Sequence, residues 1–115
     1  PLGPLVRHGD NNWGDIARWT LNALIIAEEL GVTQANVDEM KNSKNPSVQR
    51  LLGTSGDLGK QLGLDAAWAY NAIKGVGNYG EIFAKHLGEG TSLNIARGLN
   101  ELWSKGGILY APPAR

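Results

Sequence analysis

Cysteine is absent from this 115-residue sequence. Its absence excludes disulfide bonds and thiol chemistry, and it removes the thiolate ligands on which most structural zinc sites depend. The two histidines, His8 and His86, have no neighbours at a spacing typical of a transition-metal site. For His86, near the end of an expected helix, a surface cation that complements the helix dipole is the simpler interpretation. We therefore assign no metal site and no cofactor.

An excess of charge is also missing, since 11 basic and 11 acidic side chains give a formal net charge of +0 at pH 7. The charges are scattered, and no run of like charge is longer than the pair Glu28-Glu29. Nucleic-acid tracts and basic membrane-surface helices concentrate lysine and arginine instead. The composition therefore indicates no nucleic-acid partner.

Long hydrophobic runs are missing as well. The longest strongly apolar stretch, Leu21 to Ala27, includes Asn22, whereas a helix that spans a bilayer needs about 20 apolar residues. The sequence begins at Pro1 and shows no signal peptide. We expect no membrane-spanning helix, and we expect that an N-terminal part of a longer precursor is missing. The absence of cysteine permits a periplasmic location without showing it.

Apolar residues are present in sufficient number for an ordered fold, at 42% of the chain against 19% charged residues. Helical spacing of these residues, with caps and terminal glycines, predicts a mainly α fold of about six mostly short helices after a short extended N-terminal segment. The expected helices lie between Asp10 and Gly31, between Thr33 and Met40, at 46–52, at 58–62, at 66–74, at 79–88, and from Thr91 or Ser92 to a stop at Gly106-Gly107.

The first of these helices is apolar on nearly all faces between Trp19 and Leu30. A helix of this kind needs packing partners on several sides. The rest of the sequence contains no run of strands that would form a sheet against it. The pattern thus raises the question of what covers this helix.

The segment Gly75-Val76-Gly77-Asn78-Tyr79-Gly80 has the G-x-G-x-x-G spacing of a dinucleotide-binding turn. That turn works only when a strand immediately precedes the glycines, because the strand and the following helix place backbone amides against a pyrophosphate. A helical pattern, residues 66–74, precedes them here. We therefore interpret the glycines as a break between two helices.

Carboxylates and tryptophans are the remaining candidates for chemistry. Asp38 with Glu39, and Glu81 with Glu89, are the carboxylate pairs that a glycosidase would have to bring to one cleft. Solvated helix-surface charge is the simpler interpretation, although one of Glu28 and Glu29 is expected to be partly desolvated with a raised pKa. The four tryptophans are Trp13, Trp19, Trp68 and Trp103. Each lies on or beside an apolar helical face, which favours core packing over a ligand-stacking platform.

Arg7, His8 and Asp10 lie together beside the extended N-terminal segment and could face a cleft. A role in capping and turning the chain is the simpler interpretation. No catalytic, ligand-binding or metal-binding residue is assigned from the sequence.

Three segments together resemble a known family. Residues 77–85 resemble the closing helix of polar-amino-acid-binding proteins of ABC transporters, in which a glycine, a small polar residue and a tyrosine precede an amphipathic turn. Residues 1–10 with the helix from Trp13 to Leu30 resemble the return strand from the second lobe and the helix after it. The tail from Asn94 to Arg115, with Gly106 to Pro113, is similar to the general L-amino-acid-binding branch. The resemblance covers essentially the whole chain.

The resemblance implies a division of the chain into a return or hinge strand (1–9), a helical region (10–76), the closing helix (77–88) and a C-terminal helix and tail (89–115). The family has two α/β lobes that close on an amino acid, held through an arginine and an acidic residue. This chain would be the C-terminal part of the first lobe, without the clamp residues. The first helix would then pack on a sheet that is not in the sequence. Alone, the chain should expose a large apolar patch and self-associate, or be accompanied by the missing lobes.

These expectations lead to one preferred function and two alternatives. The preferred one is the C-terminal segment of a periplasmic solute-binding protein that delivers L-amino acids to an ABC importer, with the missing lobes, an amino acid and a permease as partners. It is not an enzyme. A free-standing helical protein-interaction module and a small glycan hydrolase that uses Glu81 or Glu89 are the alternatives.

Overall fold

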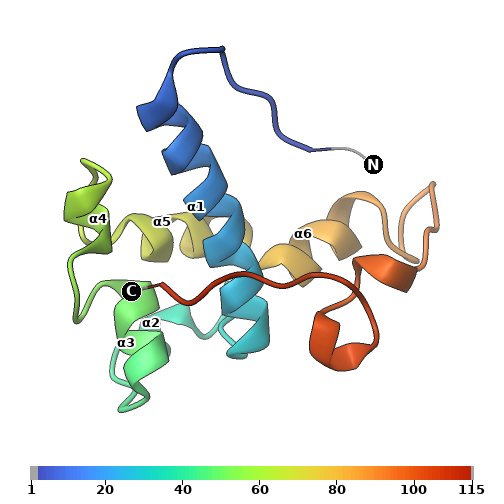
Figure 1. Ribbon diagram of the computed structural model, residues 1–115. Coiled ribbons are helices and arrows are strands. Elements are labelled where there is room, and N and C mark those ends of the chain that lie inside the picture. Colours follow the sequence, from blue (N-terminus) through green and yellow to red (C-terminus); the bar gives the residue numbers. More distant parts are fainter. Residues whose placement is uncertain (1–2, 115) are drawn as a thin grey trace.

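The computed structural model describes residues 3–114 and is largely helical (Figure 1). Its elements are α1 (Asn11–Glu29), α2 (Val37–Met40), α3 (Pro46–Leu52), α4 (Leu58–Gln61), α5 (Trp68–Val76) and α6 (Tyr79–His86), followed by the 3-10 helices η1 (Gly98–Asn100) and η2 (Trp103–Lys105). Within the described part of the chain the only β-type pairing is an isolated parallel bridge between Leu102 and Leu109. The expected mainly α fold is confirmed.

Helix α1 begins and ends where the sequence predicts. The Asp10 carboxylate accepts a hydrogen bond from the Trp13 amide at 3.0 Å, which caps the first turn. Gly31 ends the helix with a φ of 73°, in the left-handed region that glycine adopts at little cost. No helix among residues 3–114 has the length and apolar character that a bilayer crossing requires.

The two halves of α1 have different surroundings. No residue of its first half, residues 11–20, is buried, and Figure 1 shows this half projecting beyond the other helices. The second half is contacted by α3, α5 and α6. Most of the buried apolar residues form one cluster that includes part of this half: Ala23, Ile25, Ile26, Ala27, Val32, Val37, Val48, Leu51, Leu52, Ala69, Ile73, Leu102 and Ala111.

This arrangement answers the question raised by the apolar second half of α1. Short helices and a C-terminal segment of this chain enclose it, so no sheet is needed for residues 23 and 25–27 to be buried. The burial of these four residues therefore does not depend on the expected sheet, and packing of α1 on a sheet stays a prediction. The exposed first half still has no partner in the described structure.

Local capping sets most of the other boundaries. Asn45 accepts a hydrogen bond from the Ser47 amide at 2.9 Å and opens α3, with Pro46 at its first position. Helix α5 begins two residues later than the sequence predicts. The Asp65 carboxylate binds the Ala67 amide at 2.8 Å in a turn that precedes the helix.

The helix expected from Thr91 or Ser92 to Gly106 does not form; η1 and η2 are the only helical turns there. Asn94 has a left-handed φ of 48°, and the Ile95 amide donates to the Leu87 carbonyl at 2.8 Å, which holds the chain against the end of α6. Helical spacing was misleading here because tertiary contacts decide the backbone. Of the expected buried face, Leu102 is buried whereas Leu99 and Trp103 are exposed.

Residues 97–114, which we call the strap, follow an irregular path, and the last part of the strap crosses α1 (Figure 1). Backbone hydrogen bonds fold it back on itself, with the Trp103 amide bound to the Leu109 carbonyl and the Leu109 amide bound to Glu101. Gly107 makes this turn possible, since a Cβ atom there would lie 1.8 Å from the Glu101 carbonyl oxygen. Ala111 and Leu102 are the strap residues buried in the core cluster.

The N-terminal segment has no regular secondary structure over residues 3–7. Its assignment as a return or hinge strand stays a prediction, as do the other boundaries drawn from the family resemblance. The expectations that concern Pro1, Leu2 and Arg115 lie outside the described residues.

Candidate functional site

The glycine-rich segment joins two helices, as expected. Helix α5 continues through Gly75 to Val76, Gly77 turns the chain with a φ of 84°, and Asn78 caps α6. The Asn78 side chain and the Glu81 side chain bind each other's backbone amides at 3.0 Å in a capping box. A helix instead of a strand precedes the glycines, so this segment does not have the geometry of a phosphate-binding turn.

Glu81, a carboxylate considered for catalysis, has a structural role in the same cap. Its Oε1 atom accepts hydrogen bonds from the Asn78 amide at 3.0 Å and from the Gln34 amide at 3.1 Å. Glu89 lies exposed after α6. Among residues 3–114 no histidine, aspartate and glutamate side chains gather in a group that could hold a metal ion. The arrangement thus offers no support for the hydrolase alternative.

Two of the four tryptophans are partly buried and two are exposed. Trp68 packs against the core cluster and Trp19 is half-buried, but Trp13 and Trp103 are 54% and 53% exposed. Core packing was therefore a wrong prediction for the latter two within this chain.

Asp10 caps α1, which confirms the capping role expected for the N-terminal turn.

An exposed polar cluster joins α2 to α5. The Asp38 carboxylate accepts hydrogen bonds from the Tyr70 hydroxyl and from the Lys74 ammonium group, the latter at 2.5 Å, and the Lys41 ammonium group lies 4.1 Å from the Tyr70 ring centre. The hydrogen bond from Lys74 lowers the pKa of Asp38, and the bond to Asp38 raises the pKa of both Tyr70 and Lys74. Each group already has a partner, and the cluster holds the four-residue α2 in place.

A second ionic cluster is partly buried and joins the strap to α1. Arg97 donates to both carboxylate oxygens of Glu28, at 2.5 and 3.0 Å, and a third contact of 3.1 Å reaches Glu101. The Arg97 and Glu28 side chains are 19% and 12% exposed. The bonds to Glu28 raise the pKa of Arg97 above its usual value. The expected partial desolvation of one of Glu28 and Glu29 is confirmed for Glu28, whereas nothing in the sequence indicated Arg97 as its partner.

Helix α6 supplies the rest of the surroundings of Arg97. The guanidinium carbon lies 5.6 Å from the Tyr79 ring centre and 5.8 Å from that of Phe83, within the range of cation–π attraction. A Cβ atom at Gly80 would lie 2.8 Å from the Glu28 carboxylate and 2.9 Å from Arg97. Because position 80 has no side chain, the ion pair can lie directly against the backbone of α6.

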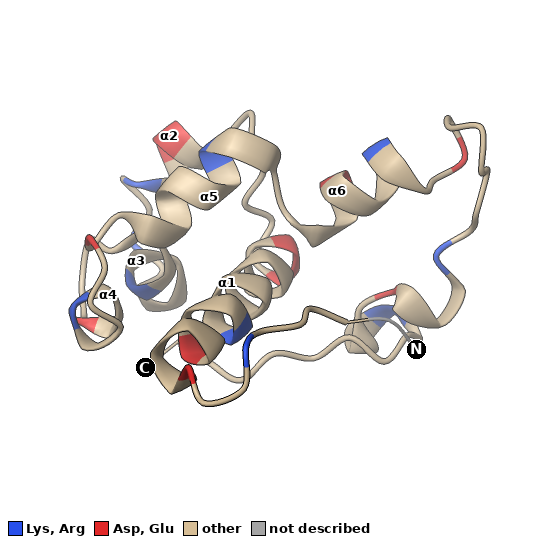
Figure 2. Cartoon of the chain, turned by 90° about the horizontal axis from the view of Figure 1, so that it is seen from above, with Lys and Arg blue, Asp and Glu red and all other residues tan. Residues whose placement is uncertain are grey.

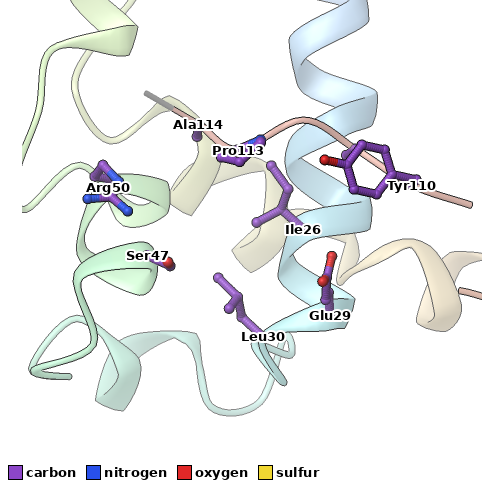
Figure 3. Close-up of a pocket in the computed structure, with 9 residues that line it drawn as sticks. Ile26, Glu29, Leu30, Ser47, Arg50, Tyr110, Pro113 and Ala114 are labelled. Carbon is purple, nitrogen blue, oxygen red and sulfur yellow. The ribbon is translucent and has the colours of Figure 1, made fainter. Parts of the chain in front are cut away.

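The pocket in Figure 3 lies where α1, α3 and the strap meet. It has a volume of about 220 Å³, an apolar floor that includes Ile26 and Leu30, and the charged side chains Glu29 and Arg50 on different sides. Its volume is below the roughly 300 Å³ at which pockets for drug-sized ligands begin.

Over the rest of the molecule, charged residues are spread over all the helices, with no concentration of one sign (Figure 2).

Comparison with known proteins shows which proteins the chain is similar to, which its geometry alone does not show. No family model matches it. The general L-amino acid-binding periplasmic protein AapJ of Rhizobium johnstonii is 64% identical over 117 residues, which cover 100% of this chain. The resemblance to amino-acid-binding periplasmic proteins is confirmed. The glutamate/glutamine/aspartate/asparagine-binding protein BztA of Rhodobacter capsulatus is 57% identical over 116 residues.

The matches cover nearly all of this chain but only part of the length of each relative. The chain spans only 34% of the length of AapJ and of BztA. A solved structure, an ABC transporter periplasmic binding protein from Brucella ovis with glutathione bound, superimposes with a TM-score of 0.92 and 57% identity. That alignment covers 96% of this chain and 35% of the Brucella chain. These relatives are named as binding proteins, and nothing among them favours a hydrolase or an interaction module.

Proposed function

We propose that this chain is the scaffold segment of a periplasmic solute-binding protein that captures L-amino acids for an ABC importer. The observation that carries the proposal is the 64% identity to a general L-amino acid-binding protein over the full chain, combined with coverage of only 34% of that protein. The sequence resemblance of residues 77–85 and 94–115 supports a place in the C-terminal part of the first lobe. The whole protein is a binding component and not an enzyme.

The ionic contacts of the chain support a scaffold role. An amino-acid clamp needs an arginine for the carboxylate and an acidic side chain for the amine, both directed into a cleft. Here the partly buried Arg97 is bound by Glu28 and Glu101, and Asp38 is bound by Tyr70 and Lys74. Those groups stabilise this segment. We therefore place the residues that hold the amino acid in the parts of the protein outside this segment.

The proposed mechanism is closure of two lobes on the ligand. An amino acid that contacts both lobes favours the closed state in proportion to its differential affinity for that state. The closed state then presents the permease with its docking surface. This segment keeps one lobe rigid during the movement, because the second half of α1 is enclosed by α3, α5 and α6.

The exposed apolar side chains fit a chain that packs against further structure. Trp13, Leu99 and Ile108 are 54%, 68% and 70% exposed, so these large apolar side chains are available for contact with further structure. The missing lobes are the proposed partners of these surfaces, and the periplasm is the proposed location. Light scattering after size-exclusion chromatography should show self-association of the isolated chain, and a monomer that resists dilution without binding an apolar dye would contradict this.

Calorimetry with a panel of L-amino acids tests the function. The protein as encoded by its gene should bind at least one of them with micromolar or tighter affinity, and residues 1–115 alone should bind none. Binding by the isolated chain would contradict the claim that the clamp lies elsewhere. Arg50→Ala, at the pocket of Figure 3, serves as a control and should leave the affinity of the encoded protein unchanged.

A further inference from the structure

The strap, residues 97–114, is held differently from every helix of the chain. It contains two three-residue 3-10 turns and one isolated bridge, so little regular structure supports it. Four of its large apolar side chains are exposed: Leu99, Trp103, Ile108 and Tyr110. Segments with few buried contacts open locally at a lower free energy than the core does. What keeps the strap closed must therefore come from a few attachments.

Those attachments are one charged contact and a few apolar contacts with the core cluster. Arg97 binds Glu28 on α1, 69 residues away in the sequence. Leu102, 2% exposed, and Ala111, 4% exposed, insert into the core cluster. Leu109 and Ala114 are partly buried against the same cluster, so the fully buried apolar anchors are one leucine side chain and one methyl group. The ion pair is thus the largest single polar attachment of the strap.

The site that receives Arg97 is built around it. The two Glu28 oxygens match the planar fork of the guanidinium group, a geometry that a lysine cannot reproduce. Tyr79 and Phe83 flank the cation, and the Gly80 backbone leaves the space that the pair occupies. Arg97 also binds the Asn100 carbonyl at 2.9 Å, which fixes the first turn of the strap.

We propose that the strap opens and closes over α1 as one unit, and that Arg97 is the latch residue that holds it closed. In the closed state the strap lines the pocket above Ile26 and Leu30. Opening exposes this apolar face of α1 while the contacts of α1 with α3, α5 and α6 remain. Arg97 holds the strap through its two hydrogen bonds to Glu28, and a positive charge alone at this position would not be sufficient.

Amide hydrogen exchange on the protein as encoded tests this proposal. The Trp103, Ile108 and Leu109 amides are bonded only within the strap, and a turn of this size does not persist once released. Arg97→Gln should raise their exchange rates by about 30-fold, because removing one partner strands a partly buried charge. The amides of α5 should change by less than about threefold. Arg97→Lys should give an intermediate increase.

Two controls distinguish a specific role of Arg97 in holding the strap from a general loss of stability of the fold. Arg18→Gln removes an exposed arginine whose pair with Asp15 is 3.9 Å long, and it should change neither region. In the unmodified protein at low denaturant, the strap amides should share one opening free energy below that of the α5 amides. Equal acceleration in the strap and in α5, or no acceleration in Arg97→Gln, would overturn the proposal. So would a common opening free energy for the two regions in the unmodified protein.

Discussion

The helical core around the second half of α1 and the strap use apolar side chains in opposite ways. In the core, Ile25, Val48 and Ile73 are at most 5% exposed and lie on separate helices. In the strap, Leu99, Trp103 and Ile108 are at least 53% exposed, and a charged residue provides much of the attachment. The difference shows that one segment can combine a core that its own side chains bury with a surface on which large apolar side chains stay exposed.

The largest expected effect contrasts one isoleucine in each region. Ile73→Ala should lower the free energy of unfolding by about 3 kcal/mol, because a fully buried side chain is replaced by a cavity. Ile108→Ala, at a position 70% exposed, should change it by less than about 0.5 kcal/mol. Denaturant unfolding of the isolated chain measures both. Equal effects would remove the distinction between core and strap.

The same contrast applies to two asparagines. Asn78 is 5% exposed, caps α6 and donates to the Val32 carbonyl at 2.9 Å. Asn78→Ala should cost about 2 kcal/mol of unfolding free energy, since both the cap and a buried hydrogen bond are lost. Asn100→Ala, at an exposed position in the strap, is the matched control and should be close to neutral. A neutral Asn78→Ala would contradict the importance of this cap.

A smaller effect is expected from a glycine in the strap. Gly107→Ala places a Cβ atom against the Glu101 carbonyl and should cost about 1 to 2 kcal/mol, because the turn between Leu102 and Leu109 must shift. Gly90→Ala meets no atom within 4 Å and is the control. Thermal unfolding of both variants measures the cost. A Gly107→Ala protein as stable as Gly90→Ala would show that the strap turn adapts freely.

The smallest effect concerns pH and the exposed cluster between α2 and α5. Because the pKa of Asp38 is lowered from 3.8, its contribution is present above about pH 4 and is lost as the pH falls through the folded value. The pKa of Tyr70 is raised from 10.0, so its contribution is present below about pH 10 and is lost at higher pH. Melting curves should therefore show a slight loss of stability at both ends of this range, and Asp38→Asn should remove it. An unchanged pH profile in Asp38→Asn would contradict the assignment.

Sequence reasoning was correct where the deciding contacts are local. The cap at Asp10, the Asn45-Pro46 start, the Gly77 break and the Gly31 stop each depend on residues within four positions. It was wrong for residues 91–106, where helical spacing was present but tertiary contacts, such as that of Ile95 with the end of α6, set the backbone. Of the candidate site, it anticipated the burial of Glu28 but not its partner, because the two are 69 residues apart.

By itself, the sequence determined the helical class, most helix boundaries, the absence of thiol chemistry and the resemblance to amino-acid-binding proteins, since all of these depend on residue type and short-range spacing. Only the tertiary structure decided which half of α1 is buried, that short helices cover it, and that Arg97 attaches the strap to Glu28. Those outcomes depend on side chains that are distant in the sequence and meet only when the chain has folded.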